Sequence, residues 1–256
     1  MFTNRPSIIA GIAASIAAPL SHAAITLVDY STVVATTTED FSGFASGGNT
    51  PYNGLVQGNG LAFGERFAGQ QLSSQTVFFP AVGFSSQFDA LSGSPTSPLT
   101  LLAGNADQNL WIGNVGLPGG FMMAGCGPAG SAFGPGGNGH GSVALLFDED
   151  QSQLGFQIFG QNGSIGVVSF FRRDGSLIET VNIDLAGLQT GGLVPELSFG
   201  FLRDGGVADI AGMSFTNVDL AGVAMDNFIF SSSIPAPGAV ALLGLAGLVG
   251  GRRRRA

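Results

Sequence analysis

Residues 165–183, IGVVSFFRRDGSLIETVNI, decide the fold class of this chain. Two runs rich in β-branched and aromatic residues, 165–172 and 177–183, flank the dipeptide Asp174-Gly175. Asp-Gly between apolar runs is a strong hairpin signal, because both residues tolerate the positive φ angles of a tight turn. The stretch therefore predicts an antiparallel β-hairpin.

Similar runs continue on both sides of this hairpin, and no window of the body shows helical periodicity. The turn at Asn162-Gly163 predicts that the two preceding strands and the hairpin form a four-stranded meander. The second half of the chain predicts strands at 142–147, 154–159, 197–202, 210–215 and 223–230. The first half predicts an opening pair of strands at 25–38 and shorter strands at 61–67, 76–79, 99–102 and 110–112. We expect an all-β protein.

Residues 113–141 form the longest irregular segment, and glycine recurs through most of it. A linker between two domains is one interpretation. We favour a long surface loop within one sandwich, because neither half would close a good core alone. The expected body is therefore a single domain, residues 24–233, a length that sandwiches commonly reach.

The charge of the body excludes one class of partner. Of nine basic residues, all of them arginine, five lie in the two terminal segments, and four remain in the body against seventeen acidic residues. Nucleic-acid binding needs clustered Lys and Arg to neutralise phosphates, so we expect no nucleic-acid partner. A net charge of about −13 suits a soluble extracellular protein and is compatible with divalent cations.

Residues 1–23 have the pattern of a secretory signal peptide. Arg5 supplies the positive start, residues 8–20 the apolar core, and Ser21-His22-Ala23 the small-x-small cleavage site. The body then has one cysteine, Cys126, so no internal disulfide forms in spite of the oxidising destination.

Residues 234–256, IPAPGAVALLGLAGLVGGRRRRA, join a Pro-x-Pro motif, an uncharged apolar block and a terminal arginine cluster. As a helix, the thirteen residues 239–251 span roughly 20 Å, against about 30 Å of hydrocarbon in a bilayer. Arginine stays on the cytoplasmic side of a membrane. We therefore expect a transient, processed signal in the inner membrane rather than a permanent anchor. The motif residues are Pro235, Ala236, Pro237, Arg252, Arg253, Arg254 and Arg255.

This tail resembles the PEP-CTERM sorting signal of exported bacterial proteins. The resemblance implies recognition and cleavage by an integral-membrane exosortase. Ala236 stands where the common motif has Glu, which leaves cleavage open. The end of the body resembles the jelly-roll-like β-sandwich that often accompanies such tails, through a closing pattern of Phe199, Gly200, Phe201, Ile210, Phe215, Asp226, Asn227 and Phe228.

The body contains few residues that could act in catalysis or bind zinc. His22 leaves with the leader, so His140 and Cys126 are the body's only histidine and cysteine, too few for a zinc site. We expect a solvated loop histidine and a small, semi-buried cysteine rather than a nucleophile and its base. No Gly-x-Ser-x-Gly elbow occurs, and no pair of carboxylates stands out for a glycosidase. We expect no enzymatic activity.

Calcium is the more plausible cofactor. The resemblance to a jelly roll implies this site, because in jelly-roll binding modules of the galactose-binding-like type an ion commonly joins an acid near the first strand to one on the last. It would be a structural Ca²⁺ held by Glu39, Asp40 and Asp226, since hard cations take carboxylate oxygens. The alternative interpretation is that Asp226 caps a turn before the final strand.

Together these features predict an exported, non-enzymatic protein of the cell surface or extracellular matrix, associated with exopolysaccharide. A carbohydrate-binding module or adhesin is the first alternative, and would place Trp111 and an acidic loop in one exposed cleft. An extracellular hydrolase is the second, and would need two carboxylates facing each other in that cleft.

Overall fold

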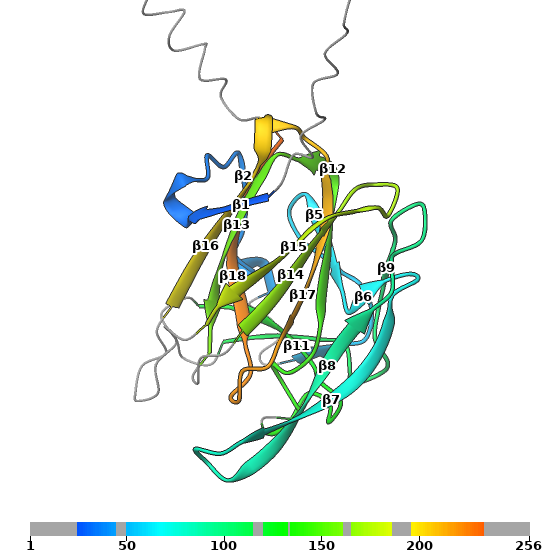
Figure 1. The fold of residues 1–256 in the computed structure, drawn as a ribbon, viewed down its shortest axis with the longest axis vertical. Coiled ribbons are helices and arrows are strands. Elements are labelled where there is room, and N and C mark those ends of the chain that lie inside the picture. Colours follow the sequence, from blue (N-terminus) through cyan, green and yellow to red (C-terminus); the bar gives the residue numbers. More distant parts are fainter. Residues whose placement is uncertain are drawn as a thin grey trace, which may run out of the picture.

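The computed structural model describes residues 25–44, 50–114, 120–132, 134–160, 165–185 and 196–232. The predicted leader, the predicted sorting tail and the turn at Asn162-Gly163 lie outside the described residues. Two large antiparallel sheets pack face to face (Figure 1). The predicted all-β antiparallel sandwich is therefore confirmed.

The first sheet has eight strands. Its order is β1 (Ile25–Asp29), β16 (Glu196–Arg203), β13 (Gln153–Phe159), β18 (Ala224–Ser231), β11 (Met122–Gly125), β10 (Leu110–Gly113) and β3 (Thr50–Tyr52), with β2 (Thr37–Glu39) also on β18. The second sheet has six strands, in the order β15 (Leu177–Asp184), β14 (Ile165–Phe171), β17 (Ile210–Asn217), β12 (Val143–Gln151), β5 (Leu61–Gly64) and β4 (Val56–Gln57).

Two smaller two-stranded sheets complete the described strands. They are β6 (Arg66–Phe67) with β9 (Leu101–Leu102), and β7 (Gln71–Phe79) with β8 (Phe84–Ser92). Single turns of 3-10 helix occur at η1 (Tyr30–Thr32), η2 (Ser42–Phe44) and η3 (Asp204–Gly206). Within the described ranges, no helix is long and apolar enough to cross a membrane.

The predicted hairpin is β14–β15, and its register places Val168 opposite Val181. Gly175 takes a φ of 82° in the turn, and its amide donates to the carbonyl oxygen of Arg172 at 2.9 Å. Val168 and Phe170 are buried between the sheets, whereas Ser169 points to the opposite face. The alternation of side chains along a strand thus gives this hairpin one core face and one outer face.

Aromatic rings dominate the core between the sheets. Phe228 of β18 lies 5.6 Å from Phe156 of β13, 5.4 Å from Phe63 of β5 and 6.0 Å from Phe41, measured between ring centroids. All four rings are buried. The high phenylalanine content of the sequence is therefore used to fill the space between two sheets.

The predicted four-stranded meander is wrong. β12 lies in the second sheet, β13 in the first, and β14 again in the second, so the chain crosses between sheets twice. Only β14 and β15 pair as sequence neighbours in that region. β12 also continues through the acidic triplet 148–150 to Gln151. Strands that alternate between sheets have the same local patterns as strands in a meander, so the local sequence does not distinguish them.

Residues 113–141 are more than a surface loop. β11 lies within this segment and pairs with both β10 and β18 in the first sheet. Strands from both halves of the chain occur in each large sheet, so a boundary in this segment would divide both sheets. His140, expected in solvent, is 1% exposed and packs on Phe88 with 4.8 Å between ring centroids.

The two described ends of the body leave the sandwich at the same end. Ile25 at the start of β1 pairs with Arg203 of β16, and the neighbouring Leu202 pairs with Gln153 of β13. Gln153 pairs in turn with Ser231 at the end of β18. Three strand spacings therefore separate the two ends, which is roughly 14 Å.

Candidate functional site

The fold brings two of the predicted calcium ligands to neighbouring strands. β2 pairs with β18, and Glu39 lies opposite Phe228, two residues after Asp226. The Glu39 carboxylate is buried and accepts two backbone hydrogen bonds, from the amide of Phe41 at 2.7 Å and from that of Asn59 at 2.6 Å. These bonds give Glu39 a structural role in holding the loops on either side of it.

The other two residues are also engaged locally. Asp40 is exposed, and hydrogen bonds from the side chain and backbone of Ser42 hold its pKa below the ordinary value. Asp226 is fully buried, and its Oδ1 accepts the amide of Asn227 at 2.7 Å. Among the described residues, no three His, Cys, Asp or Glu side chains lie close enough together to hold a metal ion. Glu39, Asp40 and Asp226 therefore do not form a calcium-ligand cluster.

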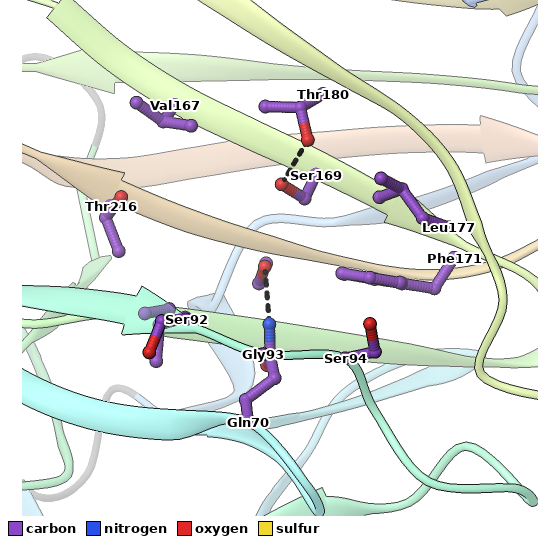
Figure 2. Close-up of a pocket in the computed structure, with 12 residues that line it drawn as sticks. Gln70, Ser92, Gly93, Ser94, Val167, Ser169, Phe171, Leu177, Thr180 and Thr216 are labelled. Carbon is purple, nitrogen blue, oxygen red and sulfur yellow. Dashed lines mark hydrogen bonds between the residues drawn. The ribbon is translucent and has the colours of Figure 1, made fainter.

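A groove of about 330 Å³ lies on the outer face of the second sheet, beside the base of the β7–β8 hairpin (Figure 2). Its wall on the sheet comes from alternate residues of β14 and β17, because every second side chain of a strand points outward, and from Leu177 and Thr180 of β15 on either side of a register shift. Its other wall comes from Gln70 and the end of β8. The lining residues are Gln70, Leu91, Ser92, Gly93, Ser94, Val167, Ser169, Phe171, Leu177, Thr180, Ser214 and Thr216.

The groove is polar but uncharged. Ser169 and Thr180 share a hydroxyl–hydroxyl bond of 2.8 Å, and the amide nitrogen of Gln70 donates to the Ser214 hydroxyl at 3.5 Å. Val167, Phe171 and Leu177 supply apolar surface between these groups. An apolar surface with a few fixed hydroxyl and amide groups suits a neutral ligand rich in hydroxyls, which needs both hydrogen bonds and contact with C–H faces.

The tryptophan that would mark a sugar-stacking platform does not lie in this groove. Trp111 is 3% exposed and packs in a buried cluster with Met122, Ala124, Cys126 and Phe159. Trp111 and an acidic loop therefore do not share an exposed cleft, which was the arrangement expected for the carbohydrate-binding-module alternative.

A second, acidic cavity of about 240 Å³ lies under the β7–β8 hairpin, lined by Glu65, Asp89 and Cys126 among others. Asp89 is buried, and its Oδ2 accepts the amide of Ser142 at 2.9 Å and the Ser142 hydroxyl at 3.3 Å. Burial raises the pKa of Asp89 above its ordinary value in spite of these bonds. Glu65 is paired with Arg66. Sequence analysis missed this carboxylate pair, because the two residues are far apart in the chain and share no motif.

The thiol in this cavity is unsuited to nucleophilic chemistry. Burial, followed by the charges of Asp107 and Asp89, raises the pKa of Cys126 to about 12, so the thiolate is scarcely populated at neutral pH. His140 forms its own contacts, with Nε2 lying 3.1 Å from the carbonyl oxygen of Leu220. Cys126 is 1% exposed, so it is buried more deeply than the expected semi-buried cysteine.

Comparisons with known proteins give a weak structural likeness and no family. No family model matches the chain, and no curated protein matches it. Among solved structures, the chain is similar to CsCBM6-3 from Clostridium stercorarium, which was solved in complex with cellobiose. The match has a TM-score of 0.28 and 17% sequence identity, and it covers 48% of this chain and 82% of that chain.

Proposed function

We propose that this chain is an exported, non-enzymatic protein of the bacterial surface or extracellular matrix, which associates with neutral exopolysaccharide. A leader at residues 1–23 directs export, and the tail at residues 234–256 enters the inner membrane transiently and is processed by an exosortase-type enzyme. The sandwich between them is the part delivered.

The position of the two ends of the body supports this proposal. Ile25 and Ser231 lie at one end of the sandwich, separated by three strand spacings. Leader and tail are thus attached at one end, and a tail held in a membrane would place that end nearest the bilayer. The groove lies on the flank formed by β14, β15 and β17, so it stays accessible in that orientation.

The charges select the kind of polysaccharide. A body with a formal charge of about −13 repels anionic polymers at low and moderate salt. The groove lining carries no formal charge and offers hydroxyl groups on an apolar surface. A neutral polysaccharide is therefore compatible with both the negative charge of the body and the uncharged lining of the groove, whereas an acidic polysaccharide is compatible with neither.

Sorting is tested in a bacterium that has an exosortase. Replacing Arg252, Arg253, Arg254 and Arg255 with glutamine should stop membrane retention and send the unprocessed chain to the medium. Mass spectrometry of the surface-associated wild-type protein should find ends near Ala23 and the Pro235–Pro237 motif. A surface protein that retains its arginines would refute processing.

Binding is tested by affinity electrophoresis in gels that contain a neutral or an anionic exopolysaccharide. Mobility should fall with the neutral polymer alone. The double variant Ser169→Ala/Thr180→Val removes two hydroxyls and should raise the dissociation constant about fivefold, the effect of roughly 1 kcal/mol. Thr100→Val removes an exposed hydroxyl outside the groove and should leave the dissociation constant unchanged. Equal retardation of the wild type and the double variant would exclude the groove.

The hydrolase alternative receives less support. A glycosidase needs two carboxylates directed at its substrate, one of them able to give up a proton. Glu65 and Asp89 share a cavity, but Arg66 pairs with the first and Ser142 bonds the second. The test uses the polymer that slows the protein's migration in the gel. If the wild type releases reducing sugar from this polymer and Asp89→Asn does not, the non-enzymatic proposal is overturned.

A further inference from the structure

The β7–β8 hairpin is an arm that forms a two-stranded sheet of its own, at the lower end of the molecule in Figure 1. Its nine-residue strands pair from Gln71 opposite Ser92 to Phe79 opposite Phe84. The inner strand is fixed to the body, because the amide of Asp89 donates to the carbonyl oxygen of His140 at 3.0 Å and the Ser86 hydroxyl accepts from the amide of Gly136 at 2.9 Å. In the described part of the chain, β7 pairs only with β8.

The outer edge of β7 lacks the usual protection against pairing with another strand. Natural edge strands are kept short or interrupted by charges, proline or a bulge. β7 is nine residues long, its pairing with β8 shows no shift of register, and Pro80 comes only after its end. No residue from 71 to 88 is charged. Such an edge is a ready template for a second strand.

The arm also exposes several large apolar side chains to solvent. Phe78 is 59% exposed, Val82 50%, Phe84 41% and Leu72 36%. Exposed apolar groups gathered on one element mark an interaction surface. Phe78 and Leu72 are six residues apart on β7, so they point to the same face of the arm.

We propose that the arm joins two copies of this chain, by antiparallel pairing of β7 with β7 about a two-fold axis at Gln75. In this register Phe78 of each copy lies opposite Leu72 of the other, so the two exposed side chains cover each other. A two-fold contact of this kind is self-complementary and closes at a dimer.

The charge distribution allows a second copy at this edge. Two bodies of about −13 each repel one another, but residues 71–88 of the arm, which projects from the body, carry no charge. Antiparallel pairing along β7 directs the two bodies away from the axis on opposite sides. The strands therefore meet where repulsion is weakest, and the dimer presents two grooves for matrix polymer.

Cysteine cross-linking of the full chain in mild detergent tests the register. Gln75→Cys should give a disulfide-linked dimer on mild oxidation, because the two copies of residue 75 face each other across the axis. Val34→Cys, 53% exposed on the body, is the matched control and should stay monomeric. The natural Cys126 is buried and should not interfere. Equal yields from the two variants would overturn the proposal.

Sedimentation in the same detergent tests the interaction itself. Thr76→Lys adds a charge to the edge and should raise the dimer dissociation constant at least tenfold, with an unchanged circular dichroism spectrum. Val34→Lys should have no effect. If the dimer persists in Thr76→Lys, the two copies make contact elsewhere, for instance through the tail, and the proposed β7–β7 pairing is refuted. Binding to phosphatidylcholine vesicles gives a second test. If Phe78→Ser releases the chain from the vesicles and leaves the dimer dissociation constant unchanged, the arm binds lipid and the proposed dimer contact is refuted.

Discussion

Asp209 joins an arginine of each large sheet at the end of the sandwich where the body begins. Its Oδ1 accepts from Nε of Arg203 at 2.6 Å, and its Oδ2 accepts from Nε of Arg172 at 2.9 Å. Arg203 closes β16 in the first sheet and is 3% exposed, whereas Arg172 follows β14 in the second. Burial alone would raise the pKa of Asp209, but the bonds and charges of Arg203 and Arg172 outweigh it and hold the pKa below its ordinary value.

Asp209→Asn should therefore lower the free energy of unfolding at pH 7 by about 2–3 kcal/mol, since it removes the carboxylate from a buried arginine. A depressed pKa means that this stabilisation is present above the ordinary aspartate value and is lost as pH falls through the folded value. The difference between wild type and variant in urea unfolding should disappear in strong acid. Asp148→Asn, an exposed acid, is the control; a difference independent of pH would contradict the linkage.

Asp89 predicts the opposite pH dependence. Its pKa is raised by burial, so the folded protein gains stability as pH falls through that value and loses it as pH rises. Asp89→Asn keeps an oxygen that accepts from Ser142 and carries no charge. We expect the variant to be at least as stable as the wild type at pH 7 and to lack the gain on acidification. Urea unfolding at pH 7 and pH 5 measures both, and a variant much less stable at pH 7 would show that the charge stabilises the fold.

At the scale of elements, the β14–β15 turn depends on Gly175. A methyl group there would lie 2.7 Å from the carbonyl oxygen of Thr96, and the φ of 82° is one that L residues adopt at a cost. Gly205 has a similar φ of 72° with nothing within 4 Å of the same position. Gly205→Ala should thus cost about 1 kcal/mol of stability through the backbone alone.

Gly175→Ala should cost at least 1 kcal/mol more than Gly205→Ala, because overpacking against Thr96 is added to the same backbone strain. Thermal melting of the two variants measures the difference. Equal losses of stability in the two variants would mean that the loop carrying Thr96 moves aside without cost and does not hold the turn in place.

The accuracy of the sequence predictions also varied by element. The hairpin at Asp174-Gly175 and the last three strands were predicted correctly, because each is defined by local alternation and turn residues. The β7–β8 arm was seen only as a short strand at 76–79, since its loop Pro80-Ala81-Val82-Gly83 carries no two-residue hairpin signal. β12 contains three consecutive acids, residues 148–150, although strands are depleted in acidic residues.

The candidate groove could not be predicted at all. Its lining comes from residues 70 to 216 of the chain, in five separate segments, and consists of common serines, threonines and apolar residues. Only the pairing of strands within the second sheet and the return of β8 across its face bring them together. The surroundings of the predicted calcium residues could not be predicted either. Topology did bring Glu39 beside β18, but the backbone amides that bind its carboxylate were not visible in the sequence.

At the scale of the molecule, one core joins both halves of the chain. Phe228 of the last strand contacts Phe41 and Phe63 from the first half as well as Phe156 from the second. The first sheet also contains β3, β10 and β11 among strands of the second half. A core shared in this way should unfold as a unit, because loss of either half exposes apolar surface of the other.

Phe228→Ala should therefore lower the stability of the whole sandwich by about 3–5 kcal/mol and keep a single transition in calorimetry, with near- and far-ultraviolet circular dichroism changing together. Val34→Ala is the control, because that side chain is 53% exposed on the body, outside the arm, and its loss should cost little. Two separate transitions in the Phe228 variant would mean that the halves fold independently. The single transition follows from the contacts of one ring with Phe41 and Phe63 from the first half and Phe156 from the second, and no property of either half alone would produce it.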